Sequence, residues 1–181
     1  MFAEFGYAGT SVQTIVNEAR VTKPSLYYYF GSKAGLYQAL IDQAHDERYR
    51  LMKEATARAS GLAAQLIEIL AALFAFINAH RELMRLAFST AFAARGEIPK
   101  EINYLPKAAR NFEFIHSLVR AGVAARELNG AFSTRDLTTG IYGMMTLKVM
   151  QHLVDPRRKL TRRHAKIMVQ LYLDGAVGRR A

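Results

Sequence analysis

The chain of 181 residues is long enough for one ordinary domain or for a small domain joined to a larger one, and half of its residues are hydrophobic, which suffices for a packed core. It has no cysteine, so disulfide bonds and thiolate metal sites are excluded. The formal net charge of +10 suits a nucleic-acid partner, but residues 154–181 hold eight Lys/Arg against two Asp/Glu, whereas residues 1–59 hold seven against six.

Neither a membrane span nor a secretion signal is expected. The longest apolar stretch, residues 62–79, is interrupted by Gln65, Glu68 and Asn78. The N-terminus lacks the basic region and the long apolar core of a signal peptide. Met1 falls inside an apparent helix, so we expect that residues before it are absent from this sequence. We predict a cytoplasmic protein.

The order of apolar residues predicts an all-α fold. Apolar side chains recur at spacings of three, four and seven residues, and no β-hairpin signal occurs. Thr10 and Gln13 have the spacing of a capping box, Thr22 suits the N-cap of the next helix, and Ser32 suits that of a long fourth helix. The predicted helices cover residues 2–5, 10–19, 23–30, 33–58, 62–79, 81–94, 106–128, 134–153 and 161–178.

The second and third predicted helices have the arrangement of a helix-turn-helix. Leu26 and Phe30 share the face of the third helix that can pack on the second. The three consecutive tyrosines at 27–29 cannot all be buried on so short a helix, and an exposed tyrosine hydroxyl can donate to a phosphate. Lys23 lies in the first turn, where base edges are reached, and Pro24 offers an apolar surface to a thymine methyl group.

Three segments resemble the DNA-binding half of the tetracycline-repressor-like (TetR) family. They read F-x-x-x-G-Y-x-x-T-S-V-x-x-I over residues 2–15, V-T-K-P-S-L-Y-Y-Y-F over residues 21–30, and S-K-x-x-L-Y over residues 32–37. The resemblance implies an N-terminal three-helix helix-turn-helix domain, residues 1–38, followed by a larger helical ligand-binding and dimerisation domain, residues 39–181. It also implies a homodimeric transcriptional repressor that a small-molecule effector releases from a palindromic double-stranded DNA operator.

The resemblance also names candidate residues. The positions that match those that usually touch DNA are Thr10, Thr22, Lys23, Pro24, Ser25, Tyr27, Tyr28, Tyr29 and Lys33. The chain departs from the family at Arg20, where the turn usually has glycine. We expect Arg20 either to loosen the turn or to add a phosphate contact. Most of the first helix is also missing.

The resemblance, together with the composition of residues 60–181, implies a site for a hydrophobic or aromatic small molecule. Phenylalanine and methionine are abundant there and polar groups are interspersed, and an apolar cavity with a few convergent polar groups is the usual form of such a site. Plain core packing is the alternative for each residue taken singly. The candidate ligand-pocket residues are Phe74, Met84, Phe88, Phe92, Phe112, His116, Tyr142 and Met145.

The resemblance also implies that the eighth and ninth predicted helices form the homodimer interface, a four-helix contact between two subunits. Gly140 and Gly143 would let another helix approach closely. Apolar side chains add area on both helices: Leu137, Ile141, Met144, Met145 and Leu153, then Ile167, Val169, Leu171, Leu173 and Ala176. The alternative is that these faces are buried within one subunit.

We do not expect an enzyme, a cofactor or a metal. No nucleophile elbow, Gly-rich phosphate loop or HExxH pattern occurs. Asp42, His45 and Asp46 could share one helix face and hold a metal, but an exposed charged helix is the simpler explanation and the one we favour. The second hypothesis for the whole chain is a helical ligand-carrier or protein-interaction module without DNA binding, which Arg20 and the short first helix would support.

Overall fold

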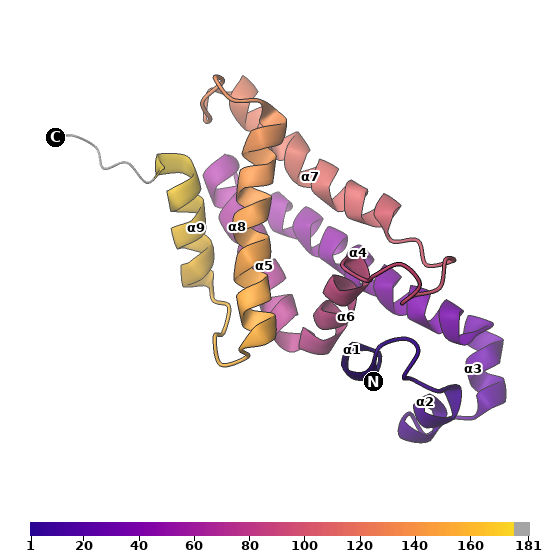
Figure 1. Cartoon of the computed structure of the whole chain (residues 1–181). Helices are drawn as coiled ribbons and strands as arrows, with labels where there is room; N and C mark the ends of the chain where they lie inside the picture. Colours follow the sequence, from indigo (N-terminus) through magenta and orange to yellow (C-terminus); the bar gives the residue numbers. More distant parts are fainter. Residues whose placement is uncertain (176–181) are drawn as a thin grey trace. The chain divides into compact units, whose positions relative to one another are not determined.

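A computed structural model describes residues 1–175, which form nine α-helices and no β-strand (Figure 1). The helices are α1 (Phe2–Phe5), α2 (Val12–Glu18), α3 (Lys23–Phe30), α4 (Lys33–Ala57), α5 (Leu62–Ala79), α6 (Arg81–Ala91), α7 (Leu105–Ala124), α8 (Thr134–Val154) and α9 (Arg162–Asp174). The predicted all-α fold is confirmed. The predicted continuation of the last helix to residue 178, which includes Ala176, lies outside the described residues.

The helices belong to two compact units. Unit 1 comprises Met1–Asp46 and Arg81–Ala108, and unit 2 comprises Glu47–His80 and the chain from Ala109 onward. Helices α4 and α7 each contribute one part to each unit. The functional division at residue 38 falls within α4 and stays a prediction.

A small core of aromatic and aliphatic side chains holds unit 1 together. Its buried members come from α1, α4, α6 and the segment before α7: Phe2, Tyr37, Ile41, Leu86 and Ile102. The Tyr37 ring meets the Phe2 ring edge-on at a centroid distance of 5.0 Å, and its hydroxyl is hydrogen-bonded to the Thr90 hydroxyl at 2.8 Å. Burial raises the pKa of Tyr37, so this hydroxyl keeps its proton at neutral pH.

Helices α2 and α3 pack through Val16 and Leu26, which are both buried. Helix α3 begins as predicted, because the Thr22 hydroxyl accepts a hydrogen bond from the Ser25 N–H at 3.2 Å. The capping box expected at Thr10 is wrong. The N-cap of α2 is Ser11, whose hydroxyl oxygen accepts from the Thr14 N–H at 3.0 Å.

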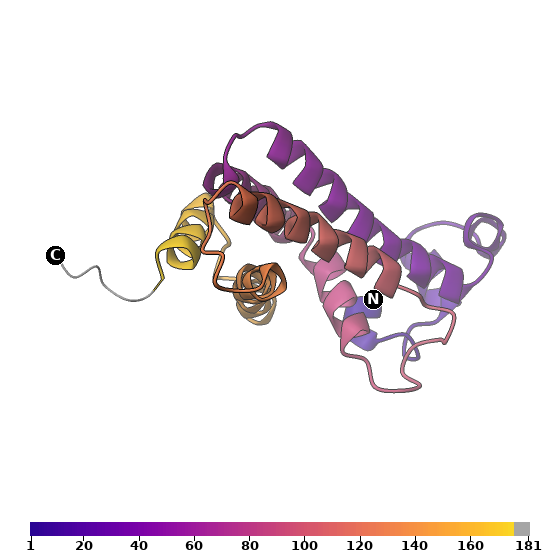
Figure 2. The same cartoon turned by 90° about the horizontal axis from the view of Figure 1, so that it is seen from above.

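Helix α5 is the central element of unit 2 and lies along α9 and beside α8 (Figures 1 and 2). By length and composition it could cross a membrane, although its three polar residues argue against a membrane span. Eight of its apolar residues are buried, and its polar residues are paired within unit 2. Glu68 pairs with Arg162 of α9, and the Asn78 amide donates to the Leu160 carbonyl oxygen at 2.6 Å. These contacts indicate the core helix of a folded unit.

Helix α9 begins with a capping box in which histidine stands where Glu or Gln is usual. The Thr161 hydroxyl oxygen accepts from the His164 N–H at 3.4 Å, and His164 Nδ1 accepts from the Thr161 N–H at 3.2 Å. Desolvation lowers the pKa of His164, and the nearby Lys148 and Arg163 lower it further. The cap therefore depends on a neutral imidazole.

This cap predicts a pH-dependent stability. Because the folded state binds the His164 proton less readily than the unfolded state, the free energy of unfolding should fall as the pH drops below about 6.5. His164→Gln keeps an acceptor at this position and does not titrate, so it should reduce the difference between unfolding midpoints at pH 7.5 and pH 5.5. An identical loss in both proteins would show that the pH dependence arises at other groups.

Candidate functional site

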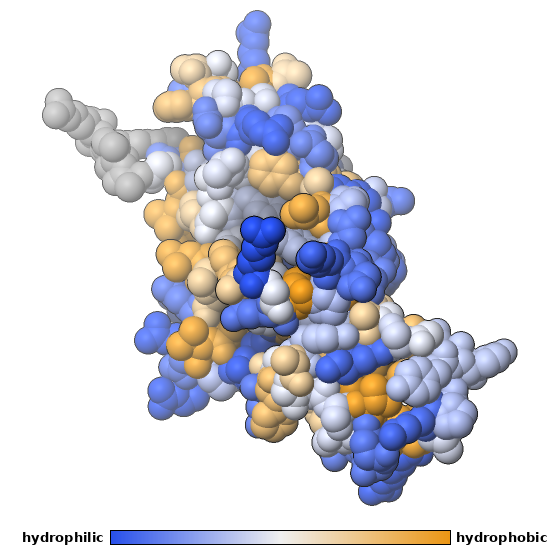
Figure 3. Space-filling model, turned by 45° about the vertical axis from the view of Figure 1, so that its right-hand side comes forward, coloured by the Kyte–Doolittle hydropathy of each residue, from blue (hydrophilic) through white to orange (hydrophobic). Residues whose placement is uncertain are grey.

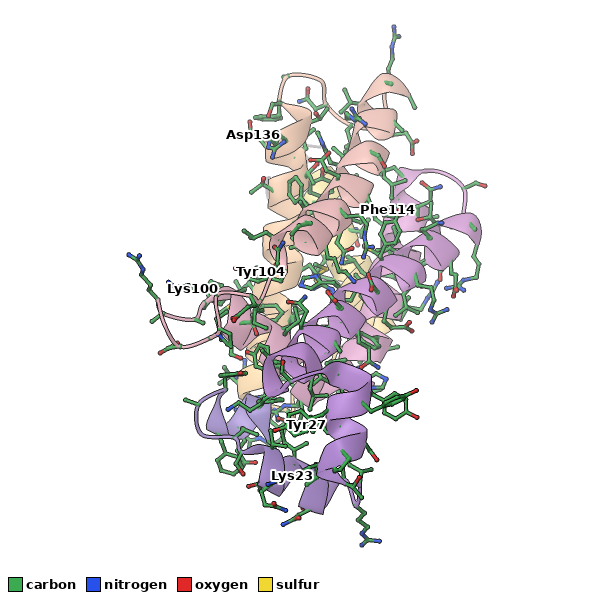
Figure 4. All side chains as sticks on the ribbon, turned by 90° about the vertical axis from the view of Figure 1, so that its right-hand side faces the viewer. Lys23, Tyr27, Lys100, Tyr104, Phe114 and Asp136 are labelled. Carbon is green, nitrogen blue, oxygen red and sulfur yellow. The ribbon has the colours of Figure 1, made fainter. Side chains whose placement is uncertain are left out.

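Three tyrosine rings project from α3. Tyr28 is 84% exposed, Tyr29 75% and Tyr27 47%, whereas Leu26 between them and α2 is only 4% exposed. Figure 4 labels Lys23 and Tyr27, which lie one turn apart on this helix. The rings of Tyr28 and Tyr29 meet edge-on at 5.1 Å. Because α3 is short, it buries one apolar side chain, Leu26, and leaves the three tyrosine rings on the surface.

The N-terminus of α3 presents polar groups beside those rings. The Thr22 and Ser25 hydroxyls are hydrogen-bonded to each other at 2.9 Å. Lys23 is exposed, and Pro24 occupies the first turn, where its missing N–H leaves no unsatisfied donor. The remaining N–H groups at a helix N-terminus favour an anion. This end of α3 can therefore offer a cation, hydroxyls and backbone donors to a phosphate.

Lys33 and Thr10 are placed differently from the other candidates. The Lys33 ammonium donates to the Tyr7 carbonyl oxygen at 2.8 Å and to the Thr10 carbonyl oxygen at 2.9 Å, and it lies 4.1 Å from the Tyr7 ring centroid. The Thr10 side chain is buried, and its hydroxyl donates to the Gly6 carbonyl oxygen at 2.7 Å. Both side chains fasten the segment between α1 and α2 in unit 1, and their roles toward DNA stay predictions.

Replacing Lys33 with methionine tests the fastening contact. Lys33→Met keeps a side chain of similar length but leaves two partly buried carbonyl oxygens without their donor, which should lower the free energy of unfolding by about 1–3 kcal/mol. Chemical denaturation measures this. Lys23→Met removes an exposed ammonium and should change stability by less than about 0.5 kcal/mol. Equal small effects would mean that the Lys33 contacts contribute little.

The turn between α2 and α3 is closed by backbone hydrogen bonds despite the arginine within it. Arg20 has a φ of +53°, in the left-handed region that glycine enters most easily. The Val21 N–H donates to the Val16 carbonyl oxygen at 3.0 Å, and the Arg20 N–H donates to the Asn17 carbonyl oxygen at 3.2 Å. This is the Schellman pattern of a helix C-terminus, so Arg20 has not loosened the turn.

Unit 2 contains a small apolar pocket among α4, α5, α7 and α8. Its volume is about 10 Å³, about the space that one water molecule needs. The lining residues are Met52, Leu66, Ile69, Leu70, Leu73, Ile115, Ile141, Tyr142 and Met145. The Tyr142 hydroxyl accepts a hydrogen bond from an Arg48 guanidinium nitrogen at 3.3 Å, which places a polar group at the edge of the pocket.

Of the eight predicted pocket residues, only Tyr142 and Met145 line this pocket. Phe112 is near it, with its ring centroid 5.5 Å from that of Tyr142, and the His116 ring lies 6.3 Å from Phe112. Phe74 is fully buried in the core of unit 2. The aliphatic residues of α5 that line the pocket were missed, although their spacing of three and four residues marks one helix face.

The other three predicted pocket residues belong to unit 1: Met84, Phe88 and Phe92. Met84 is buried, Phe88 half-buried, and Phe92 72% exposed. A larger apolar pocket of about 350 Å³ also lies in unit 1, between Ile15, Leu36, Leu40 and Leu83 and the start of α1, and none of the predicted residues lines it. The ligand roles of all eight stay predictions.

Apolar side chains remain exposed on α8 and α9. They are Leu147, Met150 and Val154 on α8, and Ile167 and Leu171 on α9. Other residues expected at a dimer interface, namely Ile141, Met145, Leu153 and Val169, are buried within unit 2. The two helices thus use one face for the core of the unit and leave a second apolar face on its surface.

The acidic face of α4 is paired with a lysine. The Lys107 ammonium lies 3.2 Å from the Asp42 carboxylate and 2.5 Å from that of Asp46. Desolvation alone would lower the pKa of Lys107, but the contacts with the two carboxylates outweigh it, and the pKa is raised. The His45 ring stacks on Tyr104 at 6.4 Å. In residues 1–175 no group of three His, Cys, Asp or Glu side chains has the arrangement of a metal site.

Comparison with known protein families gives a match for the N-terminal segment of the chain. Residues 1–40 match the family described as bacterial regulatory proteins, tetR family. Over these residues the chain matches the TetR family. The resemblance seen in the sequence is thereby confirmed, and the matched residues include α1, α2, α3 and the start of α4.

Relatives of known structure share the fold of nearly the whole chain. The HTH-type transcriptional activator FasR of Mycolicibacterium smegmatis is 25% identical over 114 residues, 63% of this chain and 52% of FasR. The TetR family regulator PfmR of Thermus thermophilus has a TM-score of 0.79 at 19% identity, with 98% of this chain and 94% of PfmR covered. FadR of Bacillus subtilis, solved with stearoyl-CoA, has a TM-score of 0.75 at 16% identity, with coverages of 97% and 94%. The chain spans about half the length of the curated relatives that it matches.

Proposed function

We propose that this chain is a sequence-specific DNA-binding transcriptional regulator that works as a homodimer in the cytoplasm. The exposed face of α3 carries the proposal. Three large aromatic side chains project from a short helix whose single buried anchor is Leu26. Exposed rings with polar tips suit contacts with sugars and phosphates, and the match of the same residues to the TetR family supports this interpretation.

In this proposal α3 lies in the major groove of the operator. Lys23 and Pro24 meet base edges, because they occupy the first turn of the recognition helix. Thr22, Ser25 and the exposed tyrosines contact the phosphates and sugars that fix the position of the helix. Lys33 and Thr10 act as positioning residues, since their side chains hold the segment before α2.

Selection of DNA from a random-sequence library tests the proposal. The purified protein should enrich duplexes with a palindrome whose half-sites are about one helical turn, or a multiple of it, apart. The enriched duplex should bind much more tightly than a scrambled duplex of equal length at the same salt concentration. Recovery of random sequence after repeated rounds would contradict sequence-specific binding and favour a module that does not act on DNA.

Dimerisation through α8 and α9 is the second part of the proposal. Residues 1–38 hold three Lys/Arg against two Asp/Glu, so one copy offers few contacts to phosphates and a second copy is needed for affinity. The exposed apolar residues of α8 lie three and four positions apart and so share one helix face. In the space-filling view apolar side chains surface on the side of unit 2 where α8 and α9 lie (Figure 3).

Charges placed on this face should separate the subunits. Leu147 and Leu171 are 60% and 49% exposed, so a Leu147→Glu, Leu171→Glu variant should fold normally but bury two carboxylates at the interface. Sedimentation at micromolar concentration should show a dimer for the wild type and a monomer for the variant. Leu105→Glu, at an equally exposed leucine elsewhere, should remain dimeric. A wild-type monomer would refute the interface.

The third part concerns a small-molecule effector. We propose that a hydrophobic or aromatic compound binds in unit 2 at the pocket beside Tyr142, where Arg48 supplies a polar contact. The pocket of about 10 Å³ is too small for such a ligand, so binding must favour a more open state of unit 2. A ligand that prefers that state shifts the population away from the closed one, which would weaken DNA binding if only the closed state fits the operator.

The chain contains no tryptophan, so a single introduced tryptophan reports on one site. Tyr142→Trp marks the unit 2 pocket and Leu83→Trp marks the pocket of unit 1. Stearoyl-CoA, the molecule bound by the structural relative FadR, is a suitable first probe. If adding the probe causes a saturable change in tryptophan emission in the Tyr142→Trp variant alone, the proposed site is supported. A change in the Leu83→Trp variant alone would instead assign the ligand to the pocket of unit 1.

A further inference from the structure

Arg20 adopts a backbone conformation that is unfavourable for arginine. Its φ of +53° puts it in the left-handed region, where the Cβ atom of any L-residue approaches the following carbonyl oxygen. The two hydrogen bonds that close the turn use only backbone atoms. Glycine would make the same bonds without this steric cost. The turn therefore gains nothing from the arginine side chain.

The Arg20 side chain has no partner that offsets this cost. It is exposed, and within residues 1–175 its guanidinium makes no hydrogen bond and no ion pair. Strained backbone of this kind is common at functional sites. Because no contact within residues 1–175 uses the guanidinium, its donors are available to a partner outside the folded chain.

The other basic side chains of residues 1–38 indicate what kind of partner this is. Residues 1–38 contain three basic side chains, Arg20, Lys23 and Lys33. The Lys33 ammonium is held by two carbonyl oxygens and the Tyr7 ring. Only Arg20 and Lys23 remain in this segment as free cations, and Arg20 stands two residues before Thr22, the N-cap of α3.

We infer that Arg20 is a phosphate-binding residue of the DNA interface, at which the turn accepts strain in order to place a guanidinium beside the recognition helix. This inference rests on the proposed DNA binding. The planar guanidinium can donate two parallel hydrogen bonds to one phosphate, which a lysine ammonium cannot reproduce. Of the free cations, Lys23 then reads bases and Arg20 fixes the position of α3 on the backbone.

The chain contains a matched control for this position. Arg126 has a φ of +61° and is exposed in unit 2, at the end of α7. The same pair of backbone bonds surrounds it, from the Glu127 N–H to the Gly122 carbonyl oxygen at 2.8 Å and from the Arg126 N–H to the Val123 carbonyl oxygen at 3.1 Å. Arg20→Gly and Arg126→Gly thus remove the same charge and relieve the same conformation.

Both glycine variants are expected to unfold at a slightly higher temperature than the wild type, by about 2 °C. They should differ in binding to the duplex that the wild-type protein selects from a random library. A plot of the logarithm of the association constant against the logarithm of the salt concentration has a negative slope. This slope should become shallower by about 0.9 for each phosphate that is no longer neutralised, which is about 1.8 for a dimer. At about 0.15 M salt this corresponds to a reduction of affinity on the order of 30-fold. Arg126→Gly should leave the slope and the affinity unchanged.

Arg20→Gln provides a second variant, because it keeps a long side chain in the strained conformation but removes the charge. Its slope should fall as far as that of Arg20→Gly. An unchanged slope in both Arg20 variants, with intact binding by the wild type, would overturn the inference and leave the proposed function standing. A wild-type protein that binds no duplex in a salt-dependent manner would overturn the proposed function and the inference together.

Discussion

The Lys23→Ala, Tyr28→Ala double variant is expected to bind the selected operator about 100- to 1,000-fold more weakly than the wild type. Both subunits are deprived of a base-edge contact and a phosphate contact, and each such contact contributes about 1–3 kcal/mol with incomplete additivity. The weakening should appear without unfolding, because Tyr28 is 84% exposed and Lys23 has no buried contact. Fluorescence anisotropy with labelled duplex measures the affinity, and circular dichroism checks the fold.

The single variants should separate the two roles. Tyr28→Ala should weaken binding to selected and scrambled duplexes by similar factors, because a phosphate contact carries no sequence information. Lys23→Ala should also change the bases recovered in a repeated selection. Arg85→Ala, at a half-buried cation of α6 whose partner is Glu82, is the control for loss of charge and should bind as the wild type does. Normal operator binding by the double variant would show that α3 does not dock as proposed.

Phe74→Ala is expected to destabilise the protein by about 3–5 kcal/mol, the usual cost of removing a fully buried phenylalanine. The Phe74 side chain is 0% exposed in the core of unit 2 and does not line the pocket beside Tyr142. The cavity left behind adds to the lost burial, because packed helices close only partly around it. Urea denaturation measures the change.

Phe92→Ala is the matched control for this variant. Both phenylalanines were predicted from the sequence as ligand residues, yet Phe92 is 72% exposed, and its removal should change stability by less than about 0.5 kcal/mol. If Phe74→Ala were as stable as the wild type but failed to respond to a ligand, Phe74 would be a ligand residue in a loosely packed core. Equal destabilisation by both variants would contradict the burial assigned to them.

Features set by neighbouring residues could be predicted from the sequence. Thr22 caps α3 as predicted, since the cap needs only the next three residues. The exposure of the tyrosines follows from the helical period, which lets Leu26 face α2 and turns the rings outward. The all-α fold follows from the same period along the whole chain. Recognition of the TetR family depended on such short-range patterns too.

Features that depend on distant contacts could not be predicted. The Lys33 ammonium binds carbonyl oxygens 26 and 23 positions earlier in the chain, so its engagement is invisible in the local sequence. Thr10 was expected to cap α2 because its spacing fits, but its hydroxyl bonds to Gly6 and Ser11 takes the cap. Residue type alone also cannot separate a buried phenylalanine such as Phe74 from an exposed one such as Phe92.

Footprinting of the wild-type protein on its selected duplex tests the central claim most directly. If two copies of α3 read the operator, two protected half-sites should appear, about one helical turn or a multiple of it apart and related by two-fold symmetry, with two chains bound per duplex. Protection of a single site by one chain, or protection that does not depend on sequence, would contradict the account.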